Sequence, residues 1–363
     1  MRVIITGGGT GGHIYPAIAI ADEIKSRHED AEILFVGTER GLEKTLVPQN
    51  GYPIRFITVS GIHRKNLLKN FKTLKDFLKG YKEAKEIIRE FKPQIVIGTG
   101  GYVCGPVVKA ASGMKIPTFI HEQNASSGLT NKMLEKFVNK VFIGFEEARS
   151  NFKKKDKVIF TGNPVRKVFF NDDKSACRAK LGIDESSFVV LSFGGSRGAA
   201  KINEVMTSVC EKFSQNNDIS IFFVTGNENY DKIITELNGK DVKIGNNIKV
   251  FPYLHDIHTY LIASDLVISR SGALTVAEIM ACGKPSILIP SPNVTGNHQY
   301  FNAKALSDKG GAITLEEKDV SADVLVDEIL KIKNDRTISD AMAEACKNAM
   351  KNNATEIIYS NLK

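Results

Sequence analysis

Two glycine-rich segments, about half a chain apart, most constrain what this chain can fold into. The first reads VIITGGGTGGH over residues 3–13, and the second reads VVLSFGGSRGA over residues 189–199. Each joins a short β-branched apolar run to a helical pattern, which is how a parallel α/β sheet presents backbone N–H groups to a phosphate. Two such units in 363 residues predict two similar α/β domains with two substrates meeting in a cleft.

Further apolar runs support two doubly wound parallel sheets, because helical patterns or glycine turns separate most of them. In the first half, strands are predicted at residues 3–6, 33–36, 54–59, 95–97, 118–120, 141–143 and 158–160. In the second half, they are predicted at residues 188–193, 219–224, 248–251, 266–269 and 286–289.

The turn-forming cluster Thr161-Gly162-Asn163-Pro164 cannot continue a strand, so we place the domain boundary there. The expected domains are residues 1–163 and 164–340. The helical tail over residues 341–363 is a candidate to pack back on the first domain.

The composition is that of an ordinary soluble globular protein, with 42% hydrophobic and 25% charged residues. We expect no secretory signal and no membrane span, since no apolar run approaches the roughly 20 residues that a bilayer requires. The five cysteines are scattered and form no C-x-x-C pair, which favours a reducing cytosol.

The net charge of +8 is concentrated in residues 64–92, which hold ten Lys or Arg and four acidic residues. Apolar residues recur there at helical spacing, so the segment is predicted to be an amphipathic helix with a basic flank. One interpretation is a surface for anionic lipid. The other is a helix that faces the core and solvates its lysines. The candidate membrane residues are Leu67, Leu68, Lys69, Phe71, Lys72, Leu74, Lys75, Leu78 and Lys79.

The first glycine loop formally satisfies the dinucleotide fingerprint G-x-G-x-x-G, but its context is poor. The acidic residue expected at the end of the second strand is represented only by Glu39, which comes late and beyond a glycine. His13 stands at the tip of the loop, where an imidazole is positioned for proton transfer. The alternative is that His13 merely caps the helix.

Polar clusters follow other predicted strands in both halves. His121-Glu122-Gln123-Asn124 follows one strand, and a flexible loop beginning at Gly100 lies at what should be the same edge. In the second half, Glu278 is suited to accept both hydroxyls of a ribose, while Thr275 and nearby amides suit a phosphate. Singly, each cluster is also typical of an ordinary turn or helix start.

Metal sites are not indicated. His255 and His258 form H-x-x-H without cysteine partners, and no D-x-D is present to hold a divalent ion on a nucleotide diphosphate. We expect helix ends and basic residues to meet the charge of the leaving group.

In order along the chain, TGGGTGGH, GTGGYVCGP, HEQN, GNPVR, GGSRGA, RSGALTVAE and NHQ resemble the MurG family of glycosyltransferases across essentially the whole sequence. The resemblance implies a GT-B fold of two Rossmann-like domains. It also implies transfer of N-acetylglucosamine, with inversion, from UDP-GlcNAc to the muramyl 4-hydroxyl of lipid I (undecaprenyl-pyrophosphoryl-MurNAc-pentapeptide). The product would be lipid II for peptidoglycan, made peripherally at the cytoplasmic face of the cell membrane without a cofactor, a metal or nucleic acid.

The same resemblance assigns roles to individual residues. His13 matches the proposed base, and residues 64–92 match a membrane-facing region. Arg197 and His298 stand where family members often have glutamine. The acceptor's pyrophosphate is expected near the first glycine loop, and the donor's diphosphate at helix ends of the second domain. The implied donor-binding residues are Thr10, Gly11, Gly12, Asn124, Arg166, Ser196, Leu254, Gly272, Ala273, Leu274, Thr275, Val276, Ala277, Glu278, His298 and Gln299.

Three other functions remain open from the sequence. A nicotinamide-dependent oxidoreductase rests on the formal glycine fingerprint, and a UDP-GlcNAc epimerase would share the two-domain architecture. A lipid-linked sugar carrier would bind the same ligands without turnover.

Overall fold

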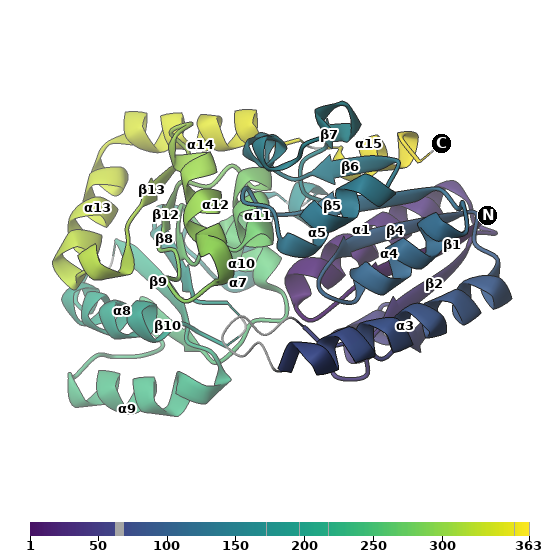
Figure 1. Ribbon diagram of the computed structural model, residues 1–363. Helices are drawn as coiled ribbons and strands as arrows, with labels where there is room; N and C mark the ends of the chain where they lie inside the picture. Colours follow the sequence, from purple (N-terminus) through teal and green to yellow (C-terminus); the bar gives the residue numbers. More distant parts are fainter. Residues whose placement is uncertain (62–68, 172, 196, 217, 352, 363) are drawn as a thin grey trace. The chain divides into compact units, whose positions relative to one another are not determined.

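The computed structural model describes residues 1–61, 69–171, 173–195, 197–216, 218–351 and 353–362. The chain divides into two compact units, each described here by itself (Figure 1). The first unit comprises Met1–Val165 and Lys351–Lys363, and the second comprises Arg166–Met350.

The first unit is built on a seven-stranded parallel sheet in the order β3-β2-β1-β4-β5-β6-β7. Its strands are nearly continuous buried apolar runs, as expected of a parallel sheet covered on both faces. They are β1 (Arg2–Gly7), β2 (Glu32–Gly37), β3 (Ile54–Phe56), β4 (Ile95–Gly100), β5 (Thr118–Glu122), β6 (Lys140–Ile143) and β7 (Val158–Phe160).

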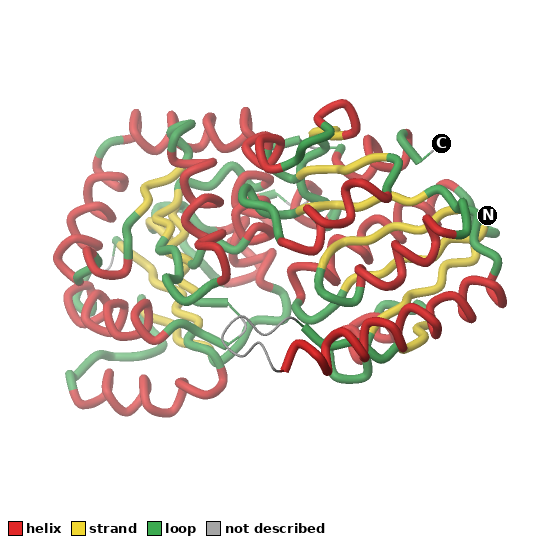
Figure 2. Tube along the Cα trace, viewed as in Figure 1, coloured by secondary structure: helices red, strands yellow, loops and turns green. Residues whose placement is uncertain are grey.

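Helices cover both faces of this sheet (Figure 2). On one face, α1 (Gly11–Arg27), α2 (Glu43–Gln49) and the C-terminal α15 (Ala354–Ser360) share a core with the sheet, in which Ile358 and Leu362 are buried. On the other face lie α3 (Lys69–Phe91), α4 (Cys104–Gly113) and α5 (Leu129–Leu134), which bury a second core.

The second unit repeats the plan with a six-stranded parallel sheet in the order β10-β9-β8-β11-β12-β13. The strands are β8 (Phe188–Phe193), β9 (Ile219–Val224), β10 (Ile248–Phe251), β11 (Leu266–Ser269), β12 (Ser286–Leu288) and β13 (Ala312–Thr314). The helices are α6 (Val168–Asn171), α7 (Lys174–Leu181), α8 (Ala200–Phe213), α9 (Tyr230–Gly239), α10 (Ile257–Ala263), α11 (Ala273–Ala281), α12 (His298–Ser307), α13 (Ala322–Asn334) and α14 (Arg336–Ala349).

The predicted fold class is confirmed, and every predicted strand is present. The third strand ends at Phe56 rather than residue 59, and β13 was not predicted. The tail over 341–363 is two helices rather than one, because Met350 has an extended backbone (ψ 141°) that ends α14. Residues 351–363 belong to the first unit, where α15 contacts α1, and residues 341–350 belong to the second. No described helix is long and apolar enough to cross a membrane.

The strand order locates the edge of each sheet at which a ligand is expected. In the first unit, the order reverses between β1 and β4, and in the second unit it reverses between β8 and β11. Parallel α/β sheets bind ligands beyond the carboxyl ends of the strands at such a reversal. The two glycine loops follow β1 and β8, so each lies at this point of its own sheet.

Candidate active site

The first glycine loop packs against its neighbours so closely that side chains are excluded. A Cβ atom on Gly7 would lie 2.0 Å from the hydroxyl oxygen of Thr99. The amide of Gly8 donates to the Gly100 carbonyl at 3.3 Å, and that of Gly9 donates to the Glu43 carboxylate at 2.9 Å. These two amides are therefore engaged within the protein. The first turn of α1, at Gly11 and Gly12, keeps the N–H groups that an incoming anion can use.

Glu43 is a part of this loop that the sequence analysis missed. Its carboxylate is buried, and it accepts the amide and the hydroxyl of Thr38 at 2.9 and 2.7 Å in addition to the Gly9 amide. A single glutamate within a helical segment carries no sequence signal for such a role. Its position below the glycine loop fixes the loop's shape.

His13 is the third residue of α1 and is partly buried. Its Nδ1 atom lies 3.1 Å from the Oε1 atom of Gln123. Gly100, with φ of +110°, lies against the imidazole, since a Cβ atom there would be 2.6 Å from Nδ1. Among the described residues, Nε2 of His13 has no hydrogen-bond partner, so this nitrogen is the one available to a substrate.

The end of β5 supplies a buried polar cluster that holds the next loop. Glu122 accepts hydrogen bonds from the amide of Asn124 at 3.0 Å, from the amide of Gly128 at 2.9 Å and from the side-chain amide of Asn131 at 2.8 Å. Asn124 is thereby oriented at the carboxyl edge. The polar density after this strand was noticed in the sequence, but only Asn124 was given a role. His121, Glu122 and Gln123 are equally part of the site.

In the second unit, the glycine loop after β8 rests on the loop after β9. A Cβ atom on Gly198, whose φ is +73°, would lie 2.0 Å from the Thr225 carbonyl oxygen, and Asn229 donates to the Arg197 carbonyl at 3.4 Å. Arg197 is exposed. Ser196 lies outside the residues that the structure describes.

The starts of α11 and α12 are joined at the carboxyl edge of the second sheet. The Ser271 hydroxyl donates to the Gln299 carbonyl at 2.8 Å, and Asn302 donates to the Ser271 carbonyl at 3.1 Å. The side-chain oxygen of Gln299 accepts from the amide of Ser291 at 2.9 Å, which positions the loop between β12 and α12. The predicted residues Gly272, Ala273, Leu274, Thr275, Val276, Ala277, Glu278, His298 and Gln299 are therefore brought together.

Glu278 is the ionisable group of this second cluster. It lies on α11, partly buried, and no hydrogen-bond partner for its carboxylate is present among the described residues. Burial raises the pKa of Glu278 to about 7, while the Arg166 guanidinium acts in the opposite direction. Leu254, also predicted, is buried just after β10 at the same edge. A partly buried carboxylate without a donor is suited to receive hydroxyl donors from a ligand.

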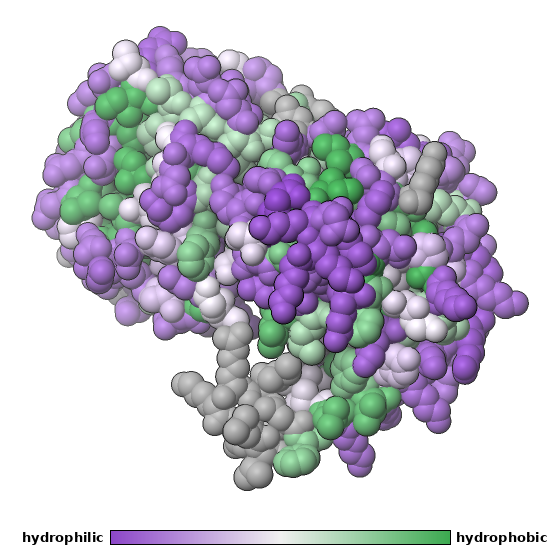
Figure 3. Space-filling model, turned by 45° about the horizontal axis from the view of Figure 1, so that its top comes forward, coloured by the Kyte–Doolittle hydropathy of each residue, from purple (hydrophilic) through white to green (hydrophobic). Residues whose placement is uncertain are grey.

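The candidate membrane residues divide along α3. The second half of the helix buries Ala84, Ile87 and Ile88. In the first half, Phe71, Leu74 and Leu78 are 76%, 58% and 60% exposed. Figure 3 shows hydrophobic atoms gathered at the lower edge of this view, where α3 begins. Leu67 and Leu68 lie outside the described residues, and the side chain of Lys69 is not described.

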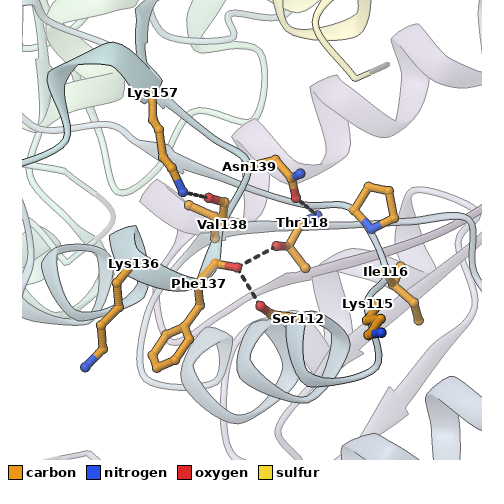
Figure 4. A pocket seen from close by; sticks show the side chains of 10 residues that line it. Ser112, Lys115, Ile116, Thr118, Lys136, Phe137, Val138, Asn139 and Lys157 are labelled. Atoms are coloured by element: carbon orange, nitrogen blue, oxygen red, sulfur yellow. Dashed lines mark hydrogen bonds between the residues drawn. The ribbon is translucent and has the colours of Figure 1, made fainter.

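A cavity of about 440 Å³ lies elsewhere, at the amino ends of β5, β6 and β7 (Figure 4). Its polar groups satisfy one another: Lys157 donates to the Val138 carbonyl at 2.5 Å, and Ser112 donates to the Phe137 carbonyl at 2.6 Å. It is thus separate from the candidate site. Within the described residues, no group of three or more His, Cys, Asp or Glu side chains is placed to hold a metal ion.

Comparisons with known proteins agree along the whole chain. Residues 3–143 match the glycosyltransferase family 28 N-terminal domain, and residues 189–357 match the family's C-terminal domain. A protein of Acetivibrio thermocellus is 47% identical over 100% of this chain and 98% of its own length. One of Bacillus subtilis is 45% identical over 100% and 99%. Both are named UDP-N-acetylglucosamine–N-acetylmuramyl-(pentapeptide) pyrophosphoryl-undecaprenol N-acetylglucosamine transferase.

Solved structures show the same architecture. The crystal structure of Acinetobacter baumannii MurG matches with a TM-score of 0.78 and 26% identity, over 99% of this chain and 98% of that one. A UDP-GlcNAc 2-epimerase from Neisseria meningitidis matches with a TM-score of 0.70 but only 15% identity, over 100% and 99% of the two chains. At that identity, the epimerase shares the fold and supports nothing further.

Proposed function

This chain belongs to glycosyltransferase family 28, and from that premise we propose that it transfers N-acetylglucosamine from UDP-GlcNAc to lipid I, giving lipid II. The observation that carries the proposal is the match to transferases of this name over the full length of both domains. The epimerase alternative has only a shared fold behind it. The oxidoreductase and carrier readings are likewise not favoured.

For the chemical step, we assign the base to His13. The muramyl 4-hydroxyl oxygen attacks the anomeric carbon of the donor, the bond from that carbon to the UDP oxygen breaks, and UDP departs with the electron pair. The hydroxyl proton passes to Nε2 of His13, the nitrogen without a partner among the described residues. Attack opposite the departing diphosphate gives inversion. General base catalysis of this kind typically contributes about 10²- to 10⁴-fold.

Donor binding is assigned chiefly to the second unit. Glu278 would accept the ribose hydroxyls, and the first turn of α11 with the loop at Gly194–Gly198 would face the diphosphate. Thr10, Gly11, Gly12 and Asn124 would contribute from the first unit, with the acceptor's pyrophosphate near the start of α1. Backbone amides and helix dipoles stabilise the charge that develops on the leaving UDP.

We further propose that the first unit binds the anionic inner face of the membrane, where lipid I resides. Three exposed apolar side chains on the first half of α3 alternate with Lys72, Lys75 and Lys79, which is typical of an interfacial helix. Leu129 and Met133 on α5 are also more than half-exposed or close to it, at 50% and 57%. Both helices begin near the carboxyl edge of the sheet, so the lipid surface would adjoin the acceptor site.

The deciding experiment is incubation with UDP-GlcNAc and a short-chain lipid I analogue, followed by the mass of the lipid product. We expect a gain of one N-acetylhexosamine and one UDP released per product. A donor-only reaction is the matched control, because an epimerase converts UDP-GlcNAc without an acceptor. Donor conversion in that control, or no transfer with acceptor present, would refute the proposal.

A further inference from the structure

We propose that Gln123 is a positioning residue that holds His13 in its Nδ1–H tautomer, so that Nε2 presents the lone pair that takes the acceptor's proton. This inference rests on the proposed function. It follows from a chain of hydrogen bonds whose directions are fixed by groups that cannot exchange roles. All of these groups belong to the first unit.

The orientation of the Gln123 amide is set by a backbone carbonyl. Its Nε2 atom lies 2.7 Å from the carbonyl oxygen of Thr99 and 3.3 Å from that of His121. A carbonyl oxygen only accepts, so the NH₂ group must face these atoms. The flipped amide would place two oxygens against each other in a buried position, which is strongly unfavourable. Oε1 of Gln123 therefore faces His13.

The tautomer of His13 follows from that orientation. Oε1 of Gln123 accepts hydrogen bonds and cannot donate, and it lies 3.1 Å from Nδ1 of His13. Nδ1 must then carry the hydrogen. In the neutral imidazole the other nitrogen is unprotonated, so Nε2 is a hydrogen-bond acceptor and a base. The opposite tautomer would leave two lone pairs facing each other and would turn an N–H group toward the substrate.

His121 completes the chain on the other side of Gln123. Its Nδ1 atom lies 3.0 Å from Nε2 of Gln123, and its own Nε2 lies 3.2 Å from the Gly162 carbonyl oxygen. Nε2 of His121 must donate to that carbonyl, so Nδ1 is free to accept from Gln123. Burial lowers the pKa of His121 to about 4, which keeps the ring neutral and its acceptor nitrogen available near neutral pH. The backbone of Gln123 is also held, because Asn163 donates to its carbonyl at 3.0 Å.

The arrangement resembles a catalytic triad in its logic, with an amide in the place of the carboxylate. In a triad, the third residue holds the histidine in the tautomer that can act as a base, and loss of the correct tautomer is severe. A neutral amide performs the same selection without adding a negative charge. Gln123 touches His13 and not the reacting atoms, so its contribution acts through the imidazole.

The test measures the tautomer directly, by ¹⁵N NMR of the histidine rings in the full-length protein without substrates. In the parent, His13 should show the pattern of a protonated Nδ1 and an unprotonated Nε2. Gln123→Ala should increase the Nε2–H population and lower kcat by about 10- to 100-fold, with the KM for UDP-GlcNAc within about threefold. Gln123→Glu, which retains an acceptor oxygen, should keep the Nδ1–H tautomer.

A matched control is Asn139→Ala. This change removes an amide that bonds the opposite end of β5, where Asn139 accepts from the Thr118 amide at 2.9 Å. It should leave the His13 tautomer and kcat unchanged. An Nε2–H form in the parent, or a Gln123→Ala protein whose tautomer and kcat match the parent, would overturn the inference. A parent with the Nδ1–H form that transfers no sugar would instead refute the proposed function.

Discussion

Nδ1 of His13 and Oε1 of Gln123 lie 3.1 Å apart although the two residues are separated by 110 positions in the chain. The contact joins the loop after β1 to the end of β5, and β4 lies between these strands in the sheet. Gln123 also bonds the Thr99 carbonyl of β4. Three neighbouring strand ends are thus tied together, and the sheet order rather than local sequence creates this part of the site.

Replacing His13 with alanine is expected to lower kcat by about 10²- to 10⁴-fold, because the base is lost, with little change in the KM for UDP-GlcNAc. Initial rates with saturating lipid I analogue measure the effect. His28→Ala is the control. His28 bonds the Tyr359 hydroxyl at 2.6 Å on α15 and should retain the parent's kcat. Turnover of His13→Ala within about threefold of the parent would remove the assignment.

Glu278→Gln is expected to have opposite effects on stability and on donor binding. Burial raises the carboxyl's pKa from 4.5 to about 7, so the folded protein holds this proton at pH values where the unfolded chain has released it. The parent therefore loses stability as pH rises from about 4.5 to 7 and stays less stable above that range. The glutamine variant should be more stable at pH 8, on the order of 1–2 kcal/mol, and unchanged at pH 4.

The same substitution should weaken UDP-GlcNAc binding, since a ribose diol is best held by an ionised carboxylate. For the parent, the KM for the donor should fall as pH rises through about 7, whereas the variant's KM should be high and flat. Thermal unfolding and donor titration from pH 4 to 8 measure both effects. Glu316→Gln, at an exposed carboxylate of the same unit, should alter neither.

Charge reversal on α3 tests the proposed membrane surface. The triple variant Lys72→Glu, Lys75→Glu and Lys79→Glu should lose cosedimentation with vesicles containing anionic lipid, because each lysine near such a surface contributes about 1 kcal/mol. Its kcat with a short-chain acceptor should be retained. Reversing the exposed Lys243, Lys309 and Lys318 of the second unit makes the same change in net charge and should not affect sedimentation. Equal losses in both variants would indicate a general charge effect.

Glu43→Gln tests whether the buried carboxylate shapes the glycine loop. Glutamine offers one acceptor oxygen in place of two, so at least one of the three donors at Gly9 and Thr38 loses its partner. An unsatisfied buried donor costs about 1–3 kcal/mol, and the unfolding free energy of the first unit should fall by that amount. Urea unfolding measures it. Glu39→Gln, at an exposed position four residues earlier, should stay within about 0.5 kcal/mol of the parent.

Most of the sheet was predictable from the sequence, because fully buried parallel strands are short, nearly continuous apolar runs. The exception is β13, where Ala312–Thr314 follows Gly310 and Gly311 and offers only three residues of signal. The amphipathic pattern of residues 64–92 predicted α3, but not which apolar residues it buries. Ile87 and Ile88 pack in the core while Leu74 and Leu78 do not, and only the packing of the helix against the sheet decides this.

Motif residues located the ends of the right strands, yet they left out the groups that hold them. Asn124 was predicted as a ligand residue, whereas Glu122 beside it accepts the bonds that orient it. Glu43 has no motif at all. Such supporting residues depend on contacts between segments far apart in the chain, so a single sequence gives no periodic or spacing signal for them.

Gly100→Ala tests how closely the imidazole of His13 depends on the backbone beneath it. A Cβ atom at Gly100 would lie 2.6 Å from Nδ1 and 2.8 Å from Cε1 of His13, and φ at this position is +110°, which L residues rarely adopt. The ring must move, and its bond to Gln123 must lengthen or break. We expect kcat to fall at least 10-fold, together with a loss of stability.

The stability effect is separated from the catalytic one by a second glycine. Gly51 also has a positive φ, +82°, but nothing lies within 4 Å of where its Cβ atom would be. Gly51→Ala therefore introduces the backbone strain without a clash, and it should lower the melting temperature while leaving kcat near the parent's value. If the two variants lose kcat equally at a temperature where both are folded, backbone strain rather than displacement of His13 is responsible. A selective loss in Gly100→Ala would instead show that the position of this imidazole limits turnover.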